Sequence, residues 1–143
     1  MGGYDVLLLD QDTGALERAR QQISPAIGKI IFLAQNILKF ILGTAKDESA
    51  GKRDLVYSFG LFDYFDQPNA RRLTQGLWQM VAPGGFLIIT NARGDVGKIW
   101  MEYVGDWFLK YKSPDDMRAL AECLTGVESF TLNTDNTRCV PVS

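Results

Sequence analysis

The sequence predicts an α/β fold with a mostly parallel sheet, and two patterns support this. Four short runs are continuously apolar, which is typical of strands buried on both faces of a parallel sheet. They are Val6–Leu9, Ile30–Leu33, Leu55–Tyr57 and Phe86–Thr90. The segments between them carry apolar residues at helical spacing, so helices are expected to alternate with these strands.

The bulk properties are those of one soluble domain spanning residues 1–143, large enough to bury a core. The net charge of −2 gives no electrostatic footprint for nucleic acid, and no apolar run has the length of a membrane span. No signal peptide is recognisable, and the two cysteines, Cys123 and Cys139, are expected to be free thiols. A cytoplasmic location is therefore expected.

Histidine is absent from the chain. This excludes Ser-His and Cys-His nucleophilic catalysis and histidine-based metal sites, and no metal site is predicted. Any proton transfer would depend on Asp, Glu, Tyr or Lys, or the reaction would need none.

In the first part of the chain, Asp12 is a good N-cap for a helix that reaches about Gln22 and ends at Ser24-Pro25. After the second strand, Gln35-Asn36 precede an apolar segment that reaches Leu42. The polar, glycine-bearing residues 44–52 predict a surface loop.

In the second part, Asp66 and Pro68 open a helix with an apolar face of Leu73, Leu77, Met80 and Val81. Pro83-Gly84-Gly85 predicts a turn before the strand Phe86–Thr90.

Two further helices and a closing hairpin are expected towards the C-terminus. Gly97–Tyr111 has an aromatic stripe at helical spacing, and Ser113-Pro114 begins a capped helix carrying Met117 and Leu120. Ser129–Leu132 and Arg138–Val142 predict the strands of an antiparallel hairpin.

Asp10 ends the first apolar run, directly before a helix. Nucleotide-binding α/β folds place a carboxylate in this way, where it can bind a ribose hydroxyl. In such folds a glycine-rich turn precedes the acid by about 20 residues, whereas nine residues precede Asp10 here. The chain therefore has the pattern of a nucleotide-binding fold without its first strand and glycine loop.

Three segments in order resemble class I S-adenosylmethionine-dependent methyltransferases. They are Leu7-Leu8-Leu9-Asp10, Asp54-Leu55-Val56-Tyr57-Ser58 and Ala82-Pro83-Gly84-Gly85-Phe86-Leu87-Ile88-Ile89. The resemblance implies a Rossmann-like fold, from its second strand to its last, with S-adenosylmethionine as cofactor. Residues 57–64 and 100–107 also resemble the bacterial 3-hydroxy fatty acid methyl ester synthases. A small-molecule or acyl carboxylate would then be the methyl acceptor.

The resemblance implies roles for the residues at the strand ends. Asp10 would bind the ribose, Asn36 the adenine, and Ser58 and Gly60 the methionine part of the cofactor, and Gln11 would also be a cofactor-binding residue. Each has a structural alternative: Asp10 as a strand-end acid, Asn36 as a turn residue, and Gly60 as a plain turn glycine.

On the acceptor side, Asp63 and Tyr64 would be the catalytic residues and Asn91, Tyr103 and Trp107 would contact the substrate. These residues could equally be surface polar groups or, for the aromatic stripe, part of the core. A carboxylate acceptor is ionised at neutral pH, so a chain without histidine is compatible with it.

In the family, the missing strand lies in the middle of the sheet, between the strands that match Val6–Leu9 and Leu55–Tyr57. Its loss would leave unpaired edges. We therefore expect a homodimer with weak or no activity by itself. The alternatives are an active methyltransferase with a glycine loop upstream, a degenerate methyltransferase-fold binding or dimerisation module, and, less favoured by the Pro-Gly-Gly segment, a dinucleotide dehydrogenase.

Overall fold

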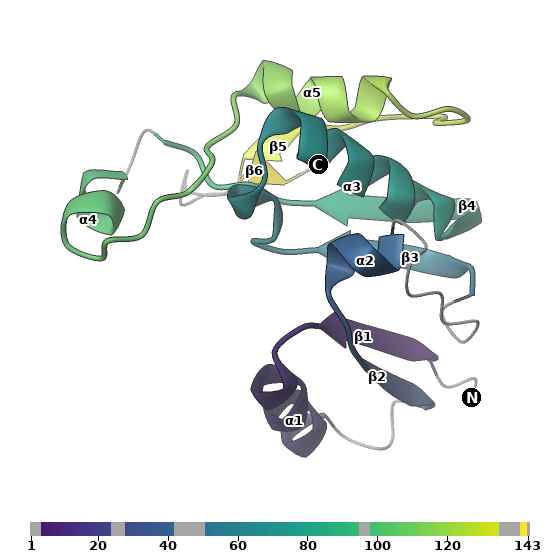
Figure 1. Ribbon diagram of the computed structural model, residues 1–143. Helices are drawn as coiled ribbons and strands as arrows, with labels where there is room; N and C mark the ends of the chain where they lie inside the picture. Colours follow the sequence, from purple (N-terminus) through teal and green to yellow (C-terminus); the bar gives the residue numbers. More distant parts are fainter. Residues whose placement is uncertain (1–3, 24–27, 42–50, 95–97, 135–140, 143) are drawn as a thin grey trace. The chain divides into compact units, whose positions relative to one another are not determined.

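The structure is a computed structural model that describes residues 4–23, 28–41, 51–94, 98–134 and 141–142 (Figure 1). The chain forms two compact units, Met1–Gly51 and Lys52–Ser143. That residues 1–143 act as one domain stays a prediction.

The first unit is a parallel strand pair with a helix packed on it. Its elements are β1 (Val6–Asp10), α1 (Thr13–Gln22), β2 (Ile30–Ala34) and α2 (Ile37–Ile41). Strands β1 and β2 pair in parallel, from Val6 opposite Ile30 to Asp10 opposite Ala34, as the sequence predicts. Helix α1 contacts both strands and buries Leu16.

Helix α1 begins where the sequence places its cap. Asp12 Oδ1 accepts hydrogen bonds from the backbone N–H groups of Gly14 (2.8 Å) and Ala15 (3.1 Å). These bonds satisfy two of the donors that the first turn of a helix leaves unpaired. Asp12 is thus a helix cap.

The second unit is built on a second parallel pair. Its elements are β3 (Arg53–Ser58), a 3₁₀ turn (Phe62–Tyr64), α3 (Gln67–Gln79), β4 (Val81–Ile89), α4 (Lys98–Tyr103), α5 (Pro114–Glu122), β5 (Asn133–Thr134) and β6 (Pro141–Val142). Strand β3 pairs in parallel with β4. Figure 1 shows α3 lying against β4 with α5 beyond it, and both contacts are present in the structure.

The core of the second unit lies between this strand pair and the helices α3 and α5. Its least exposed apolar side chains are Phe62, Ala70, Leu73, Met117 and Leu120. Val56 and Ile89 are buried, whereas their neighbours Leu55 and Tyr57 are 55% and 66% exposed. Because side chains alternate along a strand, β3 buries one face, and the prediction of strands buried on both faces is wrong for β3.

The Pro83-Gly84-Gly85 segment is not a turn before a strand, as predicted, but part of β4. The register passes from Arg53 opposite Val81 to Leu55 opposite Phe86, so β4 carries extra residues at this point. Gly84 takes a φ of 76°, which a residue with a side chain rarely adopts. The segment is therefore a glycine-bearing bulge within β4. Val81 is the first residue of this strand, so the prediction that it lies on the preceding helix is wrong.

The aromatic segment after residue 97 is helical only over α4, Lys98–Tyr103, and the prediction of a helix up to Tyr111 is wrong. At its end the backbone hydrogen bonds span more residues than in an α-helix, because Gly105 N donates to Trp100 O and Trp107 N donates to Met101 O. Asp106 takes a φ of 47°, which directs the chain out of the helix.

The aromatic stripe on this segment is also not core. Trp100 is 72% exposed and Tyr103 is 89% exposed. The apolar spacing of the segment therefore marks an exposed surface in the structure.

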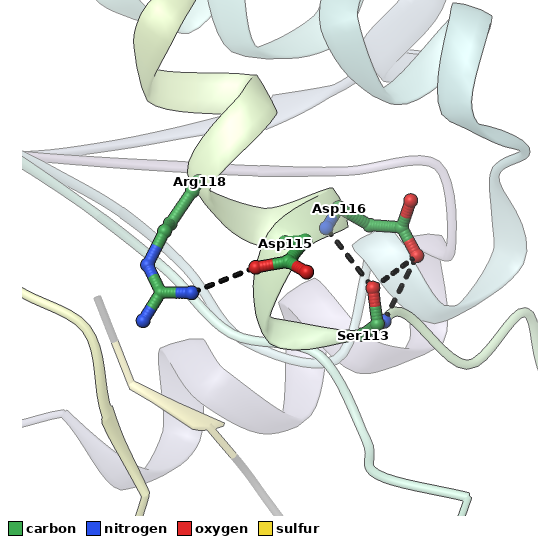
Figure 2. A network of polar contacts seen from close by, with 4 residues as sticks. All are labelled: Ser113, Asp115, Asp116 and Arg118. Carbon is green, nitrogen blue, oxygen red and sulfur yellow. Dashed lines mark hydrogen bonds and ion pairs between the residues drawn. The ribbon is translucent and has the colours of Figure 1, made fainter.

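Helix α5 begins with the predicted capping box, shown in Figure 2. Ser113 Oγ accepts from Asp116 N (3.1 Å), and Ser113 N donates to Asp116 Oδ2 (3.0 Å). The hydrogen bond from Ser113 N to the Asp116 carboxylate lowers the pKa of Asp116 most, and the hydrogen bond from the Ser113 hydroxyl lowers it further. The cap fixes where α5 begins, with Met117 and Leu120 on its buried face.

The predicted C-terminal hairpin is not shown. Residues 129–132 are irregular, and the antiparallel pairing covers only β5 and β6, with Asn133 opposite Val142 and Thr134 opposite Pro141. Residues 138–140, in the second predicted strand, lie outside the described residues.

The bulge gives a first testable prediction. A Cβ at Gly85 would lie 2.7 Å from the backbone oxygen of Asp54 and 2.9 Å from Val81 Cγ1. We expect Gly85→Ala to lower the free energy of unfolding by about 1–3 kcal/mol, because backbone must move to make room. Urea unfolding of the two proteins measures this, and an unchanged midpoint would contradict the close approach.

Candidate functional site

The carboxyl ends of β3 and β4 lie side by side and carry a group of polar residues. Thr90 N donates to Ser58 O (3.2 Å), and Gly60 N donates to Thr90 Oγ1 (3.1 Å). Gly60 has a φ of 71°, so the chain turns sharply just after β3. The predicted residues Ser58 and Gly60 thus lie at the edge of the sheet, where α/β folds bind ligands.

Asp63 lies on the 3₁₀ turn that follows and is 8% exposed. Its Oδ1 accepts from Ala92 N (2.6 Å), and its backbone oxygen accepts from Lys110 N (2.6 Å). The carboxylate faces Gly60, since a Cβ there would lie 3.9 Å from Asp63 Oδ2. Asp63 therefore connects the end of β3 to the end of β4.

Burial dominates the electrostatics of Asp63. Desolvation raises the pKa of its carboxyl above the ordinary value, although the hydrogen bond from Ala92 and the charge of Lys112 both act to lower it. Perturbed acids of this kind are concentrated at functional sites.

Lys112 is a residue of this group that the sequence analysis did not single out. It is 6% exposed, and its Nζ donates to Phe62 O (2.7 Å), Phe65 O (2.8 Å) and Asn91 Oδ1 (3.0 Å). No sequence motif marks this lysine out from Lys110, two residues earlier, because both flank Tyr111 at the end of the aromatic stretch.

Asn91 is fully buried at the end of β4. Its Nδ2 donates to Ala92 O (2.9 Å) and Lys110 O (3.3 Å), while its Oδ1 accepts from Lys112. The amide is engaged at both ends, which suits a residue that fixes the backbone around it. That it contacts a substrate directly stays a prediction.

Two of the three predicted aromatic site residues contact each other. Trp107 Nε1 donates to the hydroxyl of Tyr64 (3.2 Å), so these two predicted residues are brought together. Tyr103 lies on α4 and is 89% exposed.

Tyr111 is a second residue that the sequence analysis did not assign to the site. Its hydroxyl is buried and has no hydrogen-bond partner among the residues that the structure describes. A Cβ at Gly94 would lie 3.1 Å from Cγ of the Tyr111 ring, so the ring packs against this glycine. Desolvation, then the charges of Glu102 and Asp63, raise the pKa of this hydroxyl. It is thus a buried donor near the candidate site that could bind an acceptor atom.

In the first unit the structure also brings predicted residues together, at the carboxyl ends of β1 and β2. Asn36 Nδ2 donates to Gln11 Oε1 (2.8 Å), and Asp10 Oδ1 accepts from Asp12 N (2.9 Å). Asn36 Oδ1 also accepts from the N–H groups of Leu38 and Lys39, at the start of α2. Asp10 is exposed, as a residue that binds a ligand must be.

The described residues contain no group of three or more cysteine, aspartate or glutamate side chains that could hold a metal ion. Among the helices described, none combines the length and apolarity needed to cross a membrane.

Comparison with known proteins finds the fold in solved structures. No family model and no curated protein matches the chain. A possible exported protein from Bordetella parapertussis matches with a TM-score of 0.69 and 21% identity, over 95% of this chain and 51% of that one. The N-methyltransferase NodS from Bradyrhizobium japonicum, bound to S-adenosylhomocysteine, matches with a TM-score of 0.63 and 22% identity, over 95% and 63%.

An S-adenosylmethionine-dependent methyltransferase from Methanosarcina mazei matches with a TM-score of 0.65 and 15% identity, over 98% of this chain and 80% of that one. This chain therefore has an α/β fold with parallel strands that resembles the Rossmann-like fold of S-adenosylmethionine-dependent methyltransferases. It spans about half of the Bordetella protein and less than two thirds of NodS. At these identities the likeness shows the fold alone.

The raised pKa of Asp63 gives a second prediction. In the unfolded chain the carboxyl titrates near 3.8, and burial raises that value in the folded state. The folded protein therefore binds this proton more tightly, so the stability from Asp63 is fully present below pH 3.8 and is lost as the pH rises through the folded pKa.

Asn is an uncharged mimic of the protonated acid and can still accept from Ala92 N. We expect Asp63→Asn to raise the free energy of unfolding near neutral pH and to change it little below pH 3.8. Urea unfolding across this pH range measures the difference. Asp54→Asn, an exposed carboxyl on β3, is the matched control, and a gain of equal size at every pH would contradict the explanation.

Proposed function

We propose that this chain binds S-adenosylmethionine and is a methyltransferase-type domain acting on a carboxylate. The observation that carries the proposal is the methyltransferase-like fold with polar residues gathered at the carboxyl ends of both parallel strand pairs. Such strand ends are where open α/β sheets bind their ligands.

The residues of each unit fit parts of this cofactor. In the first unit, the exposed Asp10 already accepts from Asp12 N with Oδ1, which orients the carboxylate, and Oδ2 would accept a ribose hydroxyl. Gln11 and Asn36 hold each other by a hydrogen bond and would present amide groups to the adenine. In the second unit, the turn at Ser58 and Gly60 would allow backbone close to the methionine part.

The cofactor supplies an electrophilic methyl group on a sulfonium. In the transfer, a carboxylate oxygen of the acceptor would form the new C–O bond as the S–C bond breaks, with the electron pair left on sulfur. An ionised carboxylate needs no general base, so the task left to the protein is to hold the acceptor in line. Asp63 and Tyr64 would orient the acceptor, and Trp107 would contact its apolar part.

The finer assignment is a 3-hydroxy fatty acid as acceptor, from the resemblance of residues 57–64 and 100–107. The exposed aromatic side chains of Trp100, Tyr103 and Phe108 support it, because they offer apolar surface close in sequence to Trp107. Transfer of a labelled methyl group to a 3-hydroxy fatty acid, with the alcohol analogue as control acceptor, tests this assignment.

A second function is favoured by a different observation. Leu55, Tyr57 and Phe86 are each more than half exposed on paired strands, which is a large apolar area for a free surface. A non-catalytic module that forms a homodimer would cover such a surface. Light scattering at micromolar concentration distinguishes a dimer from a monomer, and Tyr57→Glu should disrupt the dimer if this face forms it.

The binding proposal gives a third prediction. A carboxylate accepting a ribose hydroxyl contributes on the order of 1.5–3 kcal/mol, so Asp10→Ala should weaken S-adenosylmethionine binding roughly 10- to 100-fold in calorimetric titration. Asp5→Ala removes an exposed acid just before β1, at the opposite end of the strand, and is the matched control. Equal affinity of the two variants would make Asp10 a structural acid.

A further inference from the structure

The side chain that organises the second unit most directly is Lys112. Its ammonium has three protons, and it lies within hydrogen-bond distance of the backbone oxygens of Phe62, Phe65 and Lys110 and of Asn91 Oδ1. The acceptors come from the 3₁₀ turn, from the residue after that turn, from the end of β4 and from the segment leading to α5. One cation thus joins the turn at residues 62–65 and the end of β4 to its own segment of chain.

Burying an ammonium is costly, and its surroundings show how the cost is offset. Desolvation lowers the pKa of Lys112, while the carboxylates of Asp63, Asp116 and Asp66 act in the opposite direction. These acids belong to the 3₁₀ turn, to α5 and to the cap of α3. The neighbouring Tyr111 is affected by the charge of Glu102. The ammonium of Lys98 lies over the Tyr111 ring, 5.4 Å from its centroid.

We propose that Lys112 is a positioning residue of the candidate site: its ammonium holds the turn that carries Asp63 against Asn91, and its charge favours the ionised Asp63 carboxylate, which can then bind a cationic ligand. The role as ligand site rests on the proposed function, since the sulfonium and the amino group of S-adenosylmethionine are such cations. The arrangement of Lys112 and Asp63 rests on the described contacts alone.

The geometry connects the two residues in three ways. Lys112 Nζ donates a hydrogen bond to the backbone oxygen of Phe62, the residue before Asp63. It also binds Asn91, whose neighbour Ala92 donates to the Asp63 carboxylate. The backbone oxygen of Asp63 accepts a hydrogen bond from the backbone N–H of Lys110, two residues before Lys112. Moving the ammonium would therefore disturb the turn that carries Asp63 and the segment whose Ala92 amide binds the Asp63 carboxylate.

The test uses the Ala92 amide, which lies 2.6 Å from Asp63 Oδ1, as an NMR reporter of the ionisation of Asp63. We expect the pH midpoint of this amide shift to move to higher pH in Lys112→Met, because a nearby positive charge no longer favours the carboxylate. Lys110→Met removes the same charge from an exposed side chain two residues away and should leave the midpoint in place. A loss of structure alone would not shift a titration in this direction.

If Lys112→Met folds and its midpoint equals that of the wild type, the proposal is overturned. If that variant does not fold, the coupling is measured from the other partner. Asp63→Asn keeps the shape of the side chain, and the lysine Cε resonance of Lys112 should then titrate at lower pH than in the wild type. An unchanged Lys112 midpoint in Asp63→Asn would overturn the proposal as well.

A ligand arm separates this inference from the proposed function. With S-adenosylmethionine as the probe, affinity should fall several-fold in Lys112→Met and stay within error in Lys110→Met. If the wild type binds no S-adenosylmethionine while the midpoints shift as expected, the proposed function fails and the role of Lys112 stands without it. If binding is normal in Lys112→Met and the midpoints do not move, Lys112 has no positioning role.

Discussion

The buried ammonium of Lys112 and the carbonyls around it hold together the candidate site of the second unit, at the carboxyl ends of β3 and β4. The turn after β3 leaves the oxygens of Phe62 and Phe65 pointing inward, and a buried acceptor without a partner is costly. Lys112 satisfies both and reaches Asn91 at the end of β4. Because these groups come from distant parts of the chain, the position of Asp63 depends on tertiary contacts and not on the local sequence alone.

The same surroundings account for the electrostatics of Asp63. Asp63 is nearly buried, so its charge is unfavourable there, and the Ala92 amide and the Lys112 ammonium counter this cost. A desolvated carboxylate is stabilised by binding a proton or a cation, because either one neutralises its charge. This is compatible with a cofactor that carries positive charge and with an acceptor that needs no base.

Much of the fold follows from local sequence patterns. Continuous apolar runs predicted the regions of β1 to β4, and polar caps predicted the starts of α1, α3 and α5, because capping depends only on residues within one turn. The errors have physical causes as well. Pro83-Gly84-Gly85 is a turn by composition, yet the ladder continues around it as a bulge. The apolar stripe after residue 97 has helical spacing, yet the helix ends at Tyr103, and Asp106 takes a left-handed conformation just beyond it.

The sequence by itself determined the order of strands and helices and the polar residues at the strand ends, among them Asp10, Asn36, Gly60 and Asp63, since these depend on spacing along the chain. Only the tertiary structure decided which of them meet, and with which charges. Lys110 and Lys112 look alike in the sequence, but one is exposed and the other lies among four acceptors. That difference arises from burial by elements up to 50 residues away, as in the bond from Lys112 to Phe62, and no local pattern encodes it.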